Sequence, residues 1–196
     1  MNVARTLVFG THPSETHKRP AYEPVCDGFT RVSTNGGVAV TTVVCIVGPS
    51  DSGKTTLVED LASRLECRVA TVKSIHHDVD VDTPGKDTYR HREAGAETVV
   101  GVTPERTFQI TERGKRDAPD EPTVLAETVG RLEAEGYDVV LVEGFHTTPY
   151  PKIVLGERAD VAPPIALEAD GANAVDVEEL VTRLTDRTIG GRRGDT

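Results

Sequence analysis

The stretch Gly48-Pro49-Ser50-Asp51-Ser52-Gly53-Lys54-Thr55 decides how the rest of this chain can be interpreted. It fits the pattern G-x-x-x-x-G-K-[ST], a loop whose backbone N–H groups surround phosphate oxygens. The glycines at its two ends permit backbone angles and close approaches that a Cβ atom would block. In such a loop the lysine reaches the β- and γ-phosphates, and the threonine hydroxyl contacts Mg²⁺. The motif therefore predicts a nucleoside triphosphate site.

The sequence on either side of the loop supplies the strand and the helix that the motif requires. Residues 41–47 (TTVVCIV) are apolar and rich in β-branched side chains, as in a strand that is buried on both faces. Residues 56–65 (TLVEDLASRL) carry apolar side chains three to four positions apart, which is typical of a half-buried helix. An accidental glycine-rich turn is the alternative, but it explains none of this context.

A second apolar strand is predicted to end in an acid. Residues 138–144 (DVVLVEG) contain four consecutive apolar residues, which favours a central parallel strand. Glu143 stands at the carboxyl end of that strand, where open α/β sheets bind their ligands. We predict that Glu143 faces Mg²⁺, directly or through water, and that the backbone N–H of Gly144 lies near the γ-phosphate. A glutamate that merely ends the strand is the alternative.

The rest of the chain alternates between predicted strands and helices. Further strands are expected at residues 68–73, 97–102, 106–111, 152–155 and 164–167, and helices at 88–94, 121–135 and 175–187. Asp87 and Asp176 are the expected N-caps. These elements predict an α/β P-loop fold: a mostly parallel sheet with helices on both faces, and a short β-hairpin-like extension.

The length of 196 residues favours a single folded domain. We expect it to cover residues 39–188. Residues 1–38 are polar and interrupted by prolines, and such a segment buries too little apolar surface to offset the entropy lost on ordering, so a disordered tail is expected there. A frayed C-terminal end is expected over residues 189–196.

Composition excludes several classes of function. The net charge is −10, from 32 acidic and 22 basic residues, and so acidic a chain is disfavoured as a nucleic-acid partner. The three cysteines show no C-x-x-C spacing and suit a reducing cytoplasm. No apolar run approaches the roughly 20 residues that a membrane span needs. We therefore expect a cytoplasmic protein without a membrane partner.

The polar loop at residues 74–87 has three competing interpretations. It concentrates two imidazoles and three carboxylates, those of His76, His77, Asp78, Asp80 and Asp82. They could form a metal site, although an EF-hand is excluded because Thr83 replaces its glycine and Tyr89 its last glutamate. They could belong to a switch-like loop beside the triphosphate, where an acid helps to hold Mg²⁺. The third interpretation is a solvated polar loop.

Four segments of the sequence together resemble one known family. They are GPSDSGKTT at residues 48–56, VKSIHHDVDVDTPGKDTYRHREAGA at 72–96, LVEGF at 141–145 and PKI at 151–153. They are similar to molybdopterin-guanine dinucleotide biosynthesis protein B, the MobB family, from about Val43 to Ile153. The segment from His76 to Ala96 is the most diagnostic. Ser74 departs from the pattern, which has a histidine after the lysine.

This resemblance implies a function and a set of site residues. The family implies a homodimeric GTP-binding protein with weak GTPase activity, an accessory to the guanylyltransferase that joins GMP to molybdopterin, with molybdopterin itself as a further candidate ligand. Lys54, Glu143 and Asp78 would support hydrolysis, and Thr55, Asp78 and Glu143 would hold Mg²⁺. The implied nucleotide and pterin contacts are Gly48, Ser50, Ser52, Gly53, Lys54, Thr55, Thr56, His76, His77, Lys86, Asp87 and Gly144.

Two other functions remain open at the level of the sequence. Guanine specificity rests on the resemblance alone, because no Asn-Lys-x-Asp string occurs. No residue stands out as an arginine finger, so slow turnover is expected. A P-loop small-molecule kinase that uses ATP would need an arginine-rich lid, and the sequence shows none that is convincing. A non-catalytic adaptor gated by a nucleotide would need different partner affinities in its two states.

Overall fold

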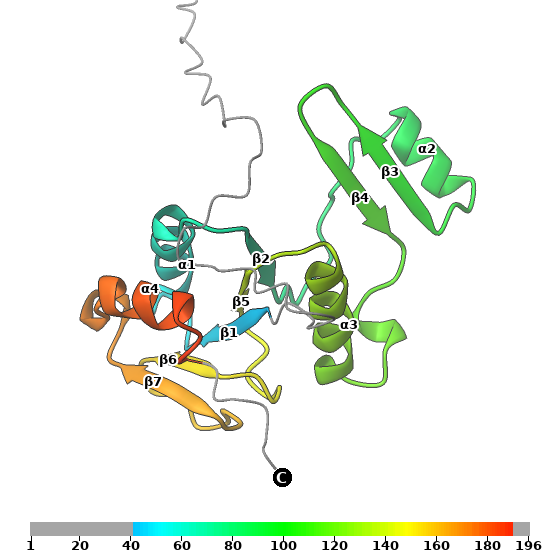
Figure 1. The fold of residues 1–196 in the computed structure, drawn as a ribbon. Helices are drawn as coiled ribbons and strands as arrows, with labels where there is room; N and C mark the ends of the chain where they lie inside the picture. The colour runs from blue at the N-terminus through cyan, green and yellow to red at the C-terminus, as the bar shows by residue number, and fades with distance from the viewer. Residues whose placement is uncertain (1–40, 190–196) are drawn as a thin grey trace, which may run out of the picture.

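The computed structural model describes residues 41–189, and Figure 1 shows how their helices and strands are arranged. The strands are β1 (Thr42–Val47), β2 (Val69–Lys73), β3 (Thr98–Val102), β4 (Thr107–Thr111), β5 (Val139–Glu143), β6 (Lys152–Leu155) and β7 (Ile165–Ala169). The α-helices are α1 (Lys54–Arg64), α2 (Asp87–Glu93), α3 (Glu121–Ala134) and α4 (Val177–Thr185), and short 3₁₀ turns lie at η1 (Lys115–Asp117) and η2 (Ala172–Ala174). The predicted tails, residues 1–38 and most of 189–196, lie outside the described residues.

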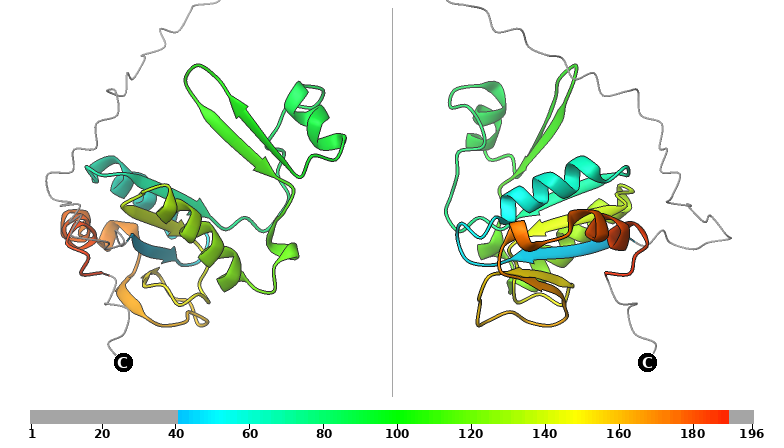
Figure 2. Two further views of the ribbon diagram at one scale, coloured as in Figure 1. Left: turned by 45° about the vertical axis from the view of Figure 1, so that its right-hand side comes forward. Right: turned by 90° about the vertical axis from the view of Figure 1, so that its left-hand side faces the viewer.

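Five strands form one parallel sheet in the order β2-β5-β1-β6-β7. All six residues of β1 are buried, because the strand lies at the centre of the sheet and helices cover both of its faces (Figure 2). Val44 and Ile46 pack with α1 and α4 on one face, and Val43, Cys45 and Val47 pack with α3 on the other. The predicted α/β fold with a mostly parallel sheet is confirmed.

The register of the sheet brings the two predicted motifs together. β5 pairs with β1 in parallel, and Ile46 lies opposite Glu143. The P-loop follows β1 directly after Val47, and β5 ends at Glu143. Glu143 therefore lies beside the P-loop at the same edge of the sheet. Parallel strands present their carboxyl ends at one edge, and that edge is where open α/β sheets bind ligands.

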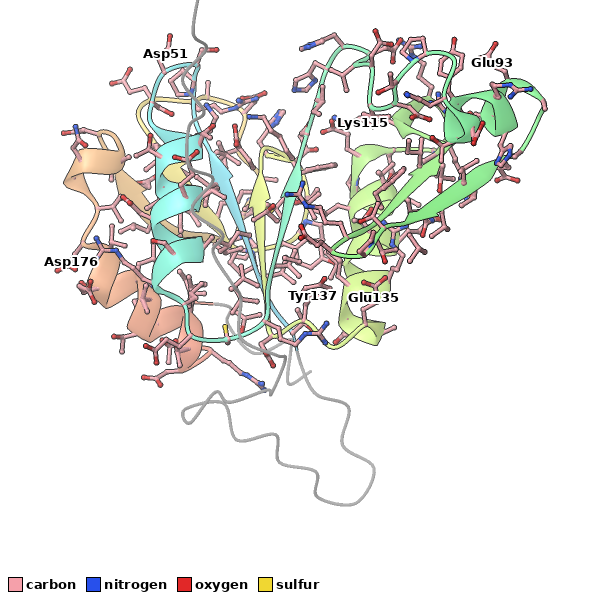
Figure 3. All side chains as sticks on the ribbon, turned by 90° about the horizontal axis from the view of Figure 1, so that it is seen from above. Asp51, Glu93, Lys115, Glu135, Tyr137 and Asp176 are labelled. Carbon is pink, nitrogen blue, oxygen red and sulfur yellow. The ribbon has the colours of Figure 1, made fainter. Side chains whose placement is uncertain are left out.

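The predicted hairpin-like extension is also present. β3 and β4 pair in antiparallel, α2 packs beside β3, and Figure 3 shows this unit standing beside the sheet, with Glu93 at its far end and Lys115 near its junction with the core. Helix α2 has Lys86 as its N-cap and Asp87 as its first residue, so the N-cap predicted at Asp87 was wrong by one position. Lys86 is still extended, at φ −76° and ψ 163°, which defines it as the cap.

One residue of the acidic loop holds this extension together. The side chain of Asp82 is 7% exposed and accepts hydrogen bonds from Thr83 N at 2.8 Å and from Thr88 Oγ1 at 3.0 Å. Arg92 on α2 lies 3.5 Å from the other oxygen of Asp82, and its Nε donates to Glu112, which follows β4. Asp82 therefore has a structural role.

The C-terminal part of the described chain returns to the core. Asp176 caps α4 as predicted, and its side chain accepts a hydrogen bond from Glu179 N at 3.0 Å. The helix ends at Thr185, two residues earlier than expected. Ile189, predicted to begin the frayed end, is buried in the core. None of the helices between residues 41 and 189 is long and apolar enough to cross a bilayer.

Candidate nucleotide-binding site

The P-loop is held in a conformation that requires its two glycines. Gly48 has φ 155°, and a Cβ atom there would lie 2.2 Å from the carbonyl oxygen of Leu155. Gly53 has φ 87°, and a Cβ atom there would lie 2.6 Å from the Cβ of Ala172. Helix α1 begins at the next residue with no side-chain cap, so its first amides are directed at the loop. This is the arrangement in which helix N-termini bind phosphate.

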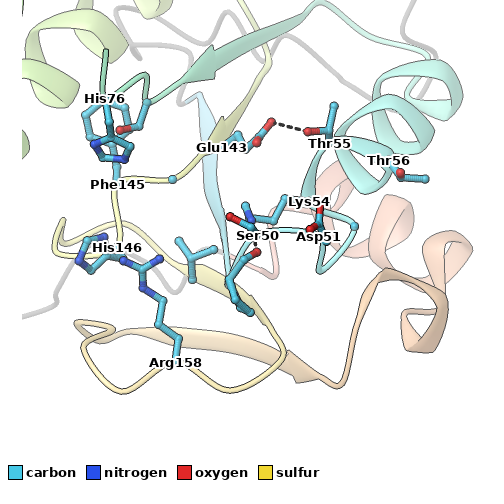
Figure 4. Close-up of a pocket in the computed structure, with 16 residues that line it drawn as sticks. Ser50, Asp51, Lys54, Thr55, Thr56, His76, Glu143, Phe145, His146 and Arg158 are labelled. Carbon is cyan, nitrogen blue, oxygen red and sulfur yellow. Dashed lines mark hydrogen bonds between the residues drawn. The ribbon is translucent and has the colours of Figure 1, made fainter.

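The loop forms one wall of a cavity of about 660 Å³ at the carboxyl edge of the sheet (Figure 4). This volume lies within the range of small-molecule sites in proteins. Its lining residues come from the P-loop, from the start of the loop after β2, from the segment after β5 and from the loop after β6: Val47, Gly48, Pro49, Ser50, Asp51, Gly53, Lys54, Thr55, Thr56, Ser74, His76, Glu143, Gly144, Phe145, His146 and Arg158.

The side chains of Thr55 and Glu143 meet inside this cavity. Thr55 Oγ1 donates a hydrogen bond to Glu143 Oε2 at 3.1 Å, and Lys73 Nζ lies 3.0 Å from the other carboxylate oxygen. The side chain of Glu143 is 13% exposed, so the carboxylate is fixed from both sides. Hydroxyl and carboxylate oxygens are ligands that Mg²⁺ prefers, and Mg²⁺ commonly uses one or two protein groups together with phosphates. The residues present therefore fit a magnesium ion, which Thr55 and Glu143 would hold.

Lys54 lies across the mouth of the loop, among charged groups of both signs. Its Nζ donates to the carbonyl oxygen of Pro49. Burial lowers the pKa of Lys54, the charge of Glu143 partly offsets this, and the charges of Arg158 and Lys73 lower it further. Lys54 and Arg158 both line the cavity, and two cations at one site favour a polyanionic ligand.

The structure gathers most of the predicted site residues around the cavity. Those that line it are Gly48, Ser50, Gly53, Lys54, Thr55, Thr56, His76, Glu143 and Gly144. Ser52 lies in the loop but turns its hydroxyl to the Pro49 carbonyl oxygen, at 3.0 Å. The amide of Gly144 donates to the carbonyl oxygen of Ile46 at 3.0 Å, so this N–H belongs to the sheet rather than to the cavity.

Besides Ser52, four other predicted site residues lie outside the cavity lining: His77, Asp78, Lys86 and Asp87. Asp78 is 92% exposed and faces Arg116 at 3.6 Å, while Asp87 is 89% exposed and faces Arg90 at 3.7 Å. Between residues 41 and 189 no group of three or more His, Cys, Asp or Glu side chains is arranged to hold a metal ion. The loop at 74–87 thus contributes His76 and Ser74 to the site and no metal cluster.

Sequence reasoning assigned no role at the site to Phe145, His146 or Arg158. Phe145 has φ 57°, a strained conformation for an aromatic residue, and Lys115 lies over its ring at 5.0 Å. Phe145 and His146 could have been anticipated because they follow Glu143 in the chain. Arg158 follows β6, and nothing in its local sequence marks it; its place depends on β6 lying next to β1.

The comparisons with known proteins agree with this geometry. The model of the family described as molybdopterin guanine dinucleotide synthesis protein B (MobB) matches residues 43–178, which is most of the chain. The chain belongs to the MobB family. The match includes the P-loop, the acidic loop, Glu143 and the segment with Arg158.

Curated relatives support the MobB assignment. The chain is 39% identical over 123 residues to the molybdopterin-guanine dinucleotide biosynthesis adapter protein of Haemophilus influenzae, covering 61% of this chain and 65% of the relative. It is 39% identical over 110 residues to the Escherichia coli protein of the same name, covering 54% and 60%. The matched part therefore spans less than two thirds of either relative.

A crystal structure of molybdopterin-guanine biosynthesis protein B (mobB) has the same fold. The TM-score is 0.55 at 24% sequence identity, and the comparison covers 75% of this chain and 98% of that one. The MobB fold of this chain is thus supported by sequence and by structure.

Proposed function

We propose that this MobB-family chain is a cytoplasmic accessory protein of molybdopterin guanine dinucleotide synthesis that binds GTP with Mg²⁺ and hydrolyses it slowly. The observation that carries the proposal is the contact of Thr55 with Glu143 at 3.1 Å beside a complete P-loop. A hydroxyl and a carboxylate from distant parts of the chain meet where the metal of a bound triphosphate would lie.

The residues of the site would have separate roles in binding the nucleotide and the metal. Lys54 and the amides at the start of α1 would neutralise the phosphate charge, and Thr55 and Glu143 would hold the metal. The chemistry that a bound Mg²⁺ would supply is neutralisation of the charge that develops on the phosphates. Asp78 faces Arg116 outside the cavity, so Glu143 is the carboxylate on which the proposal depends. GTP rather than ATP is proposed from the family membership.

The accessory role is proposed from the names of the relatives. Both curated relatives are called adapter proteins of molybdopterin-guanine dinucleotide biosynthesis. We propose that the partner is the guanylyltransferase that joins GMP to molybdopterin, that the chain acts as a homodimer, and that molybdopterin is a further candidate ligand near His76. An adapter transmits its nucleotide state through different partner affinities in the triphosphate and diphosphate states.

A combined hydrolysis and association experiment tests this function. Phosphate release would be measured with Mg²⁺ and either GTP or ATP, and association with the purified guanylyltransferase would be measured with GTP, with GDP and without nucleotide. We expect slow release from GTP and nucleotide-dependent association. Glu143→Gln should lower the release rate by about tenfold or more, since a carboxylate bond to a charged group is worth about 1.5–3 kcal/mol.

Glu178→Gln provides a matched control, because this glutamate is 74% exposed on α4. It should leave both readouts unchanged. Rapid phosphate transfer from ATP to a small acceptor would favour the kinase instead. The proposal would be contradicted if association with the guanylyltransferase were the same with GTP, with GDP and without nucleotide, and if no hydrolysis were detected.

A further inference from the structure

Arg158 enters the phosphate cavity from a part of the chain that carries no recognised motif. It lies in the loop after β6, and its side chain is 30% exposed. Figure 4 shows it reaching toward His146 across the cavity from Glu143 and Thr55. It shares the cavity lining with Pro49 and Ser50, the outer part of the P-loop. A long cation is therefore placed beside the loop that surrounds the phosphates.

The guanidinium of Arg158 is bound at its Nε by a carboxylate, which also contacts a histidine. Its Nε donates to Asp160 Oδ1 at 3.0 Å, and Nε2 of His146 lies 2.9 Å from Oδ2 of the same carboxylate. Across residues 41–189, Arg158 makes no other hydrogen bond, so its terminal NH₂ groups are available to a ligand. A carboxylate that binds Nε in this way restricts the rotation of the side chain and leaves the rest of the planar fork exposed.

Stability of the fold does not explain this arrangement. A partly exposed ion pair contributes little to folding, about 0–1 kcal/mol. Arg158 also shares the cavity lining with a second cation, Lys54. Burial lowers the pKa of Lys54, the charge of Glu143 raises it, and the charge of Arg158 lowers it. Bringing like charges together is unfavourable unless an anion binds between them. Guanidinium groups are well suited to phosphate oxygens because they donate two parallel hydrogen bonds.

We propose that Arg158 contacts the terminal phosphate of the bound nucleoside triphosphate, and that Asp160 and His146 position it, so that this arginine distinguishes triphosphate from diphosphate. The inference rests on the proposed nucleotide site. The terminal phosphate is the relevant one because Arg158 lines the same cavity as Lys54, and the P-loop lysine reaches the β- and γ-phosphates. Arg158 would then make the affinity of the site depend on whether the nucleotide is a triphosphate or a diphosphate.

Calorimetry with a non-hydrolysable imido analogue of GTP and with GDP, both with Mg²⁺, tests the inference. Arg158→Ala should weaken binding of the analogue by about tenfold while GDP changes by less than about threefold, as expected for loss of a charge-assisted bond. Arg158→Lys should restore part of the difference. Asp160→Asn and His146→Gln should weaken the analogue to a smaller degree, and these losses should vanish when Arg158 is already alanine, because a positioning residue acts through the residue that it holds.

Arg90→Ala is the control, since Arg90 is a 72% exposed arginine on α2 outside the cavity. It should change neither affinity. Thermal unfolding would confirm that each variant is folded. Equal losses for the analogue and GDP, or no loss for either, would overturn the role of Arg158 and leave the P-loop site intact. Absence of any binding by the unmodified chain would instead overturn the proposed function and the inference with it.

Discussion

At the scale of single residues, Thr55 and Glu143 show how the site is assembled. They are 88 positions apart and meet at 3.1 Å because β1 and β5 are neighbours that end at the same edge of the sheet. Lys73 binds the second oxygen of Glu143, so the carboxylate is oriented before any ligand arrives. A group whose position is fixed in advance loses less conformational entropy when it binds.

Thr55 offers a conservative test of this geometry. Thr55→Val removes the hydroxyl and keeps the shape, and it should weaken Mg²⁺-dependent triphosphate binding by about tenfold to a hundredfold, because a hydrogen bond or ligand bond to a charged group is lost. Thr55→Ser keeps the hydroxyl and should bind nearly as the unmodified chain does. Titration of the nucleotide at several Mg²⁺ concentrations gives the measurement. Unchanged Mg²⁺ dependence in Thr55→Val would argue against Thr55 as a metal-side residue.

The sequence could predict the residues of the P-loop and Glu143, and it could not predict Arg158. The P-loop residues are adjacent in the chain, and their spacing alone specifies their geometry. Arg158 becomes a site residue only because β6 lies on the other side of β1, and strand order is a property of the whole sheet. Asp82 is a different case. The composition of the loop at residues 74–87 suggested that Asp82 binds a ligand, while the burial and the hydrogen bonds of its side chain show that it supports the extension.

At the scale of elements, apolar runs, helical periodicity and capping signals together predicted every strand and α-helix between residues 41 and 189. The predicted strand at 152–155 coincides with β6, and the helix expected at 121–135 ends one residue later than α3. Helix ends were less predictable, because the backbone conformation of one residue decides the cap. The expected N-cap at Asp87 failed for this reason, whereas Asp176 is a true cap whose side chain binds an amide.

Helix α3 provides a paired test of backbone conformation. Gly130 lies inside the helix, and a Cβ atom there would meet nothing within 4 Å. Gly130→Ala should therefore raise the free energy of unfolding by about 0.5–1 kcal/mol. Gly136, just after the helix, has φ 82°, and Gly136→Ala should lower it by about 1 kcal/mol. Urea denaturation of both variants measures the two shifts, and shifts of the same sign would contradict this description of α3.

At the scale of the whole molecule, the chain consists of a P-loop core and an extension made of α2, β3 and β4 (Figure 3). The core has buried clusters on both faces of its sheet. The extension exposes apolar side chains, with Val102 at 77% and Val100 at 54%, and depends more on polar bonds such as those of Asp82. We expect the two parts to differ in local stability.

Hydrogen exchange of Asp82→Ala tests that difference. Removing the carboxylate leaves Thr88 and Arg92 without this partner, so amides of β3 and β4 should lose protection by about tenfold to a hundredfold. Amides of β1 and β5 should be unaffected. Asp80→Ala changes an exposed aspartate of the same loop and should have no effect on either part. Uniform loss of protection across β1 and β3 would indicate that the extension and the core unfold together.

The central claim is that the P-loop cavity is a Mg²⁺-dependent GTP site. Calorimetry with GTP, ATP and GDP tests it most directly, on the unmodified chain, on Lys54→Ala and on Arg64→Ala, in which a cation at the far end of α1 is removed. High salt is suitable because it screens the acidic surface of a chain with net charge −10. We predict that GTP binds more tightly than ATP and that Lys54→Ala alone weakens GTP by about tenfold to a hundredfold. Equal GTP affinity in the unmodified chain and in Lys54→Ala would contradict the account.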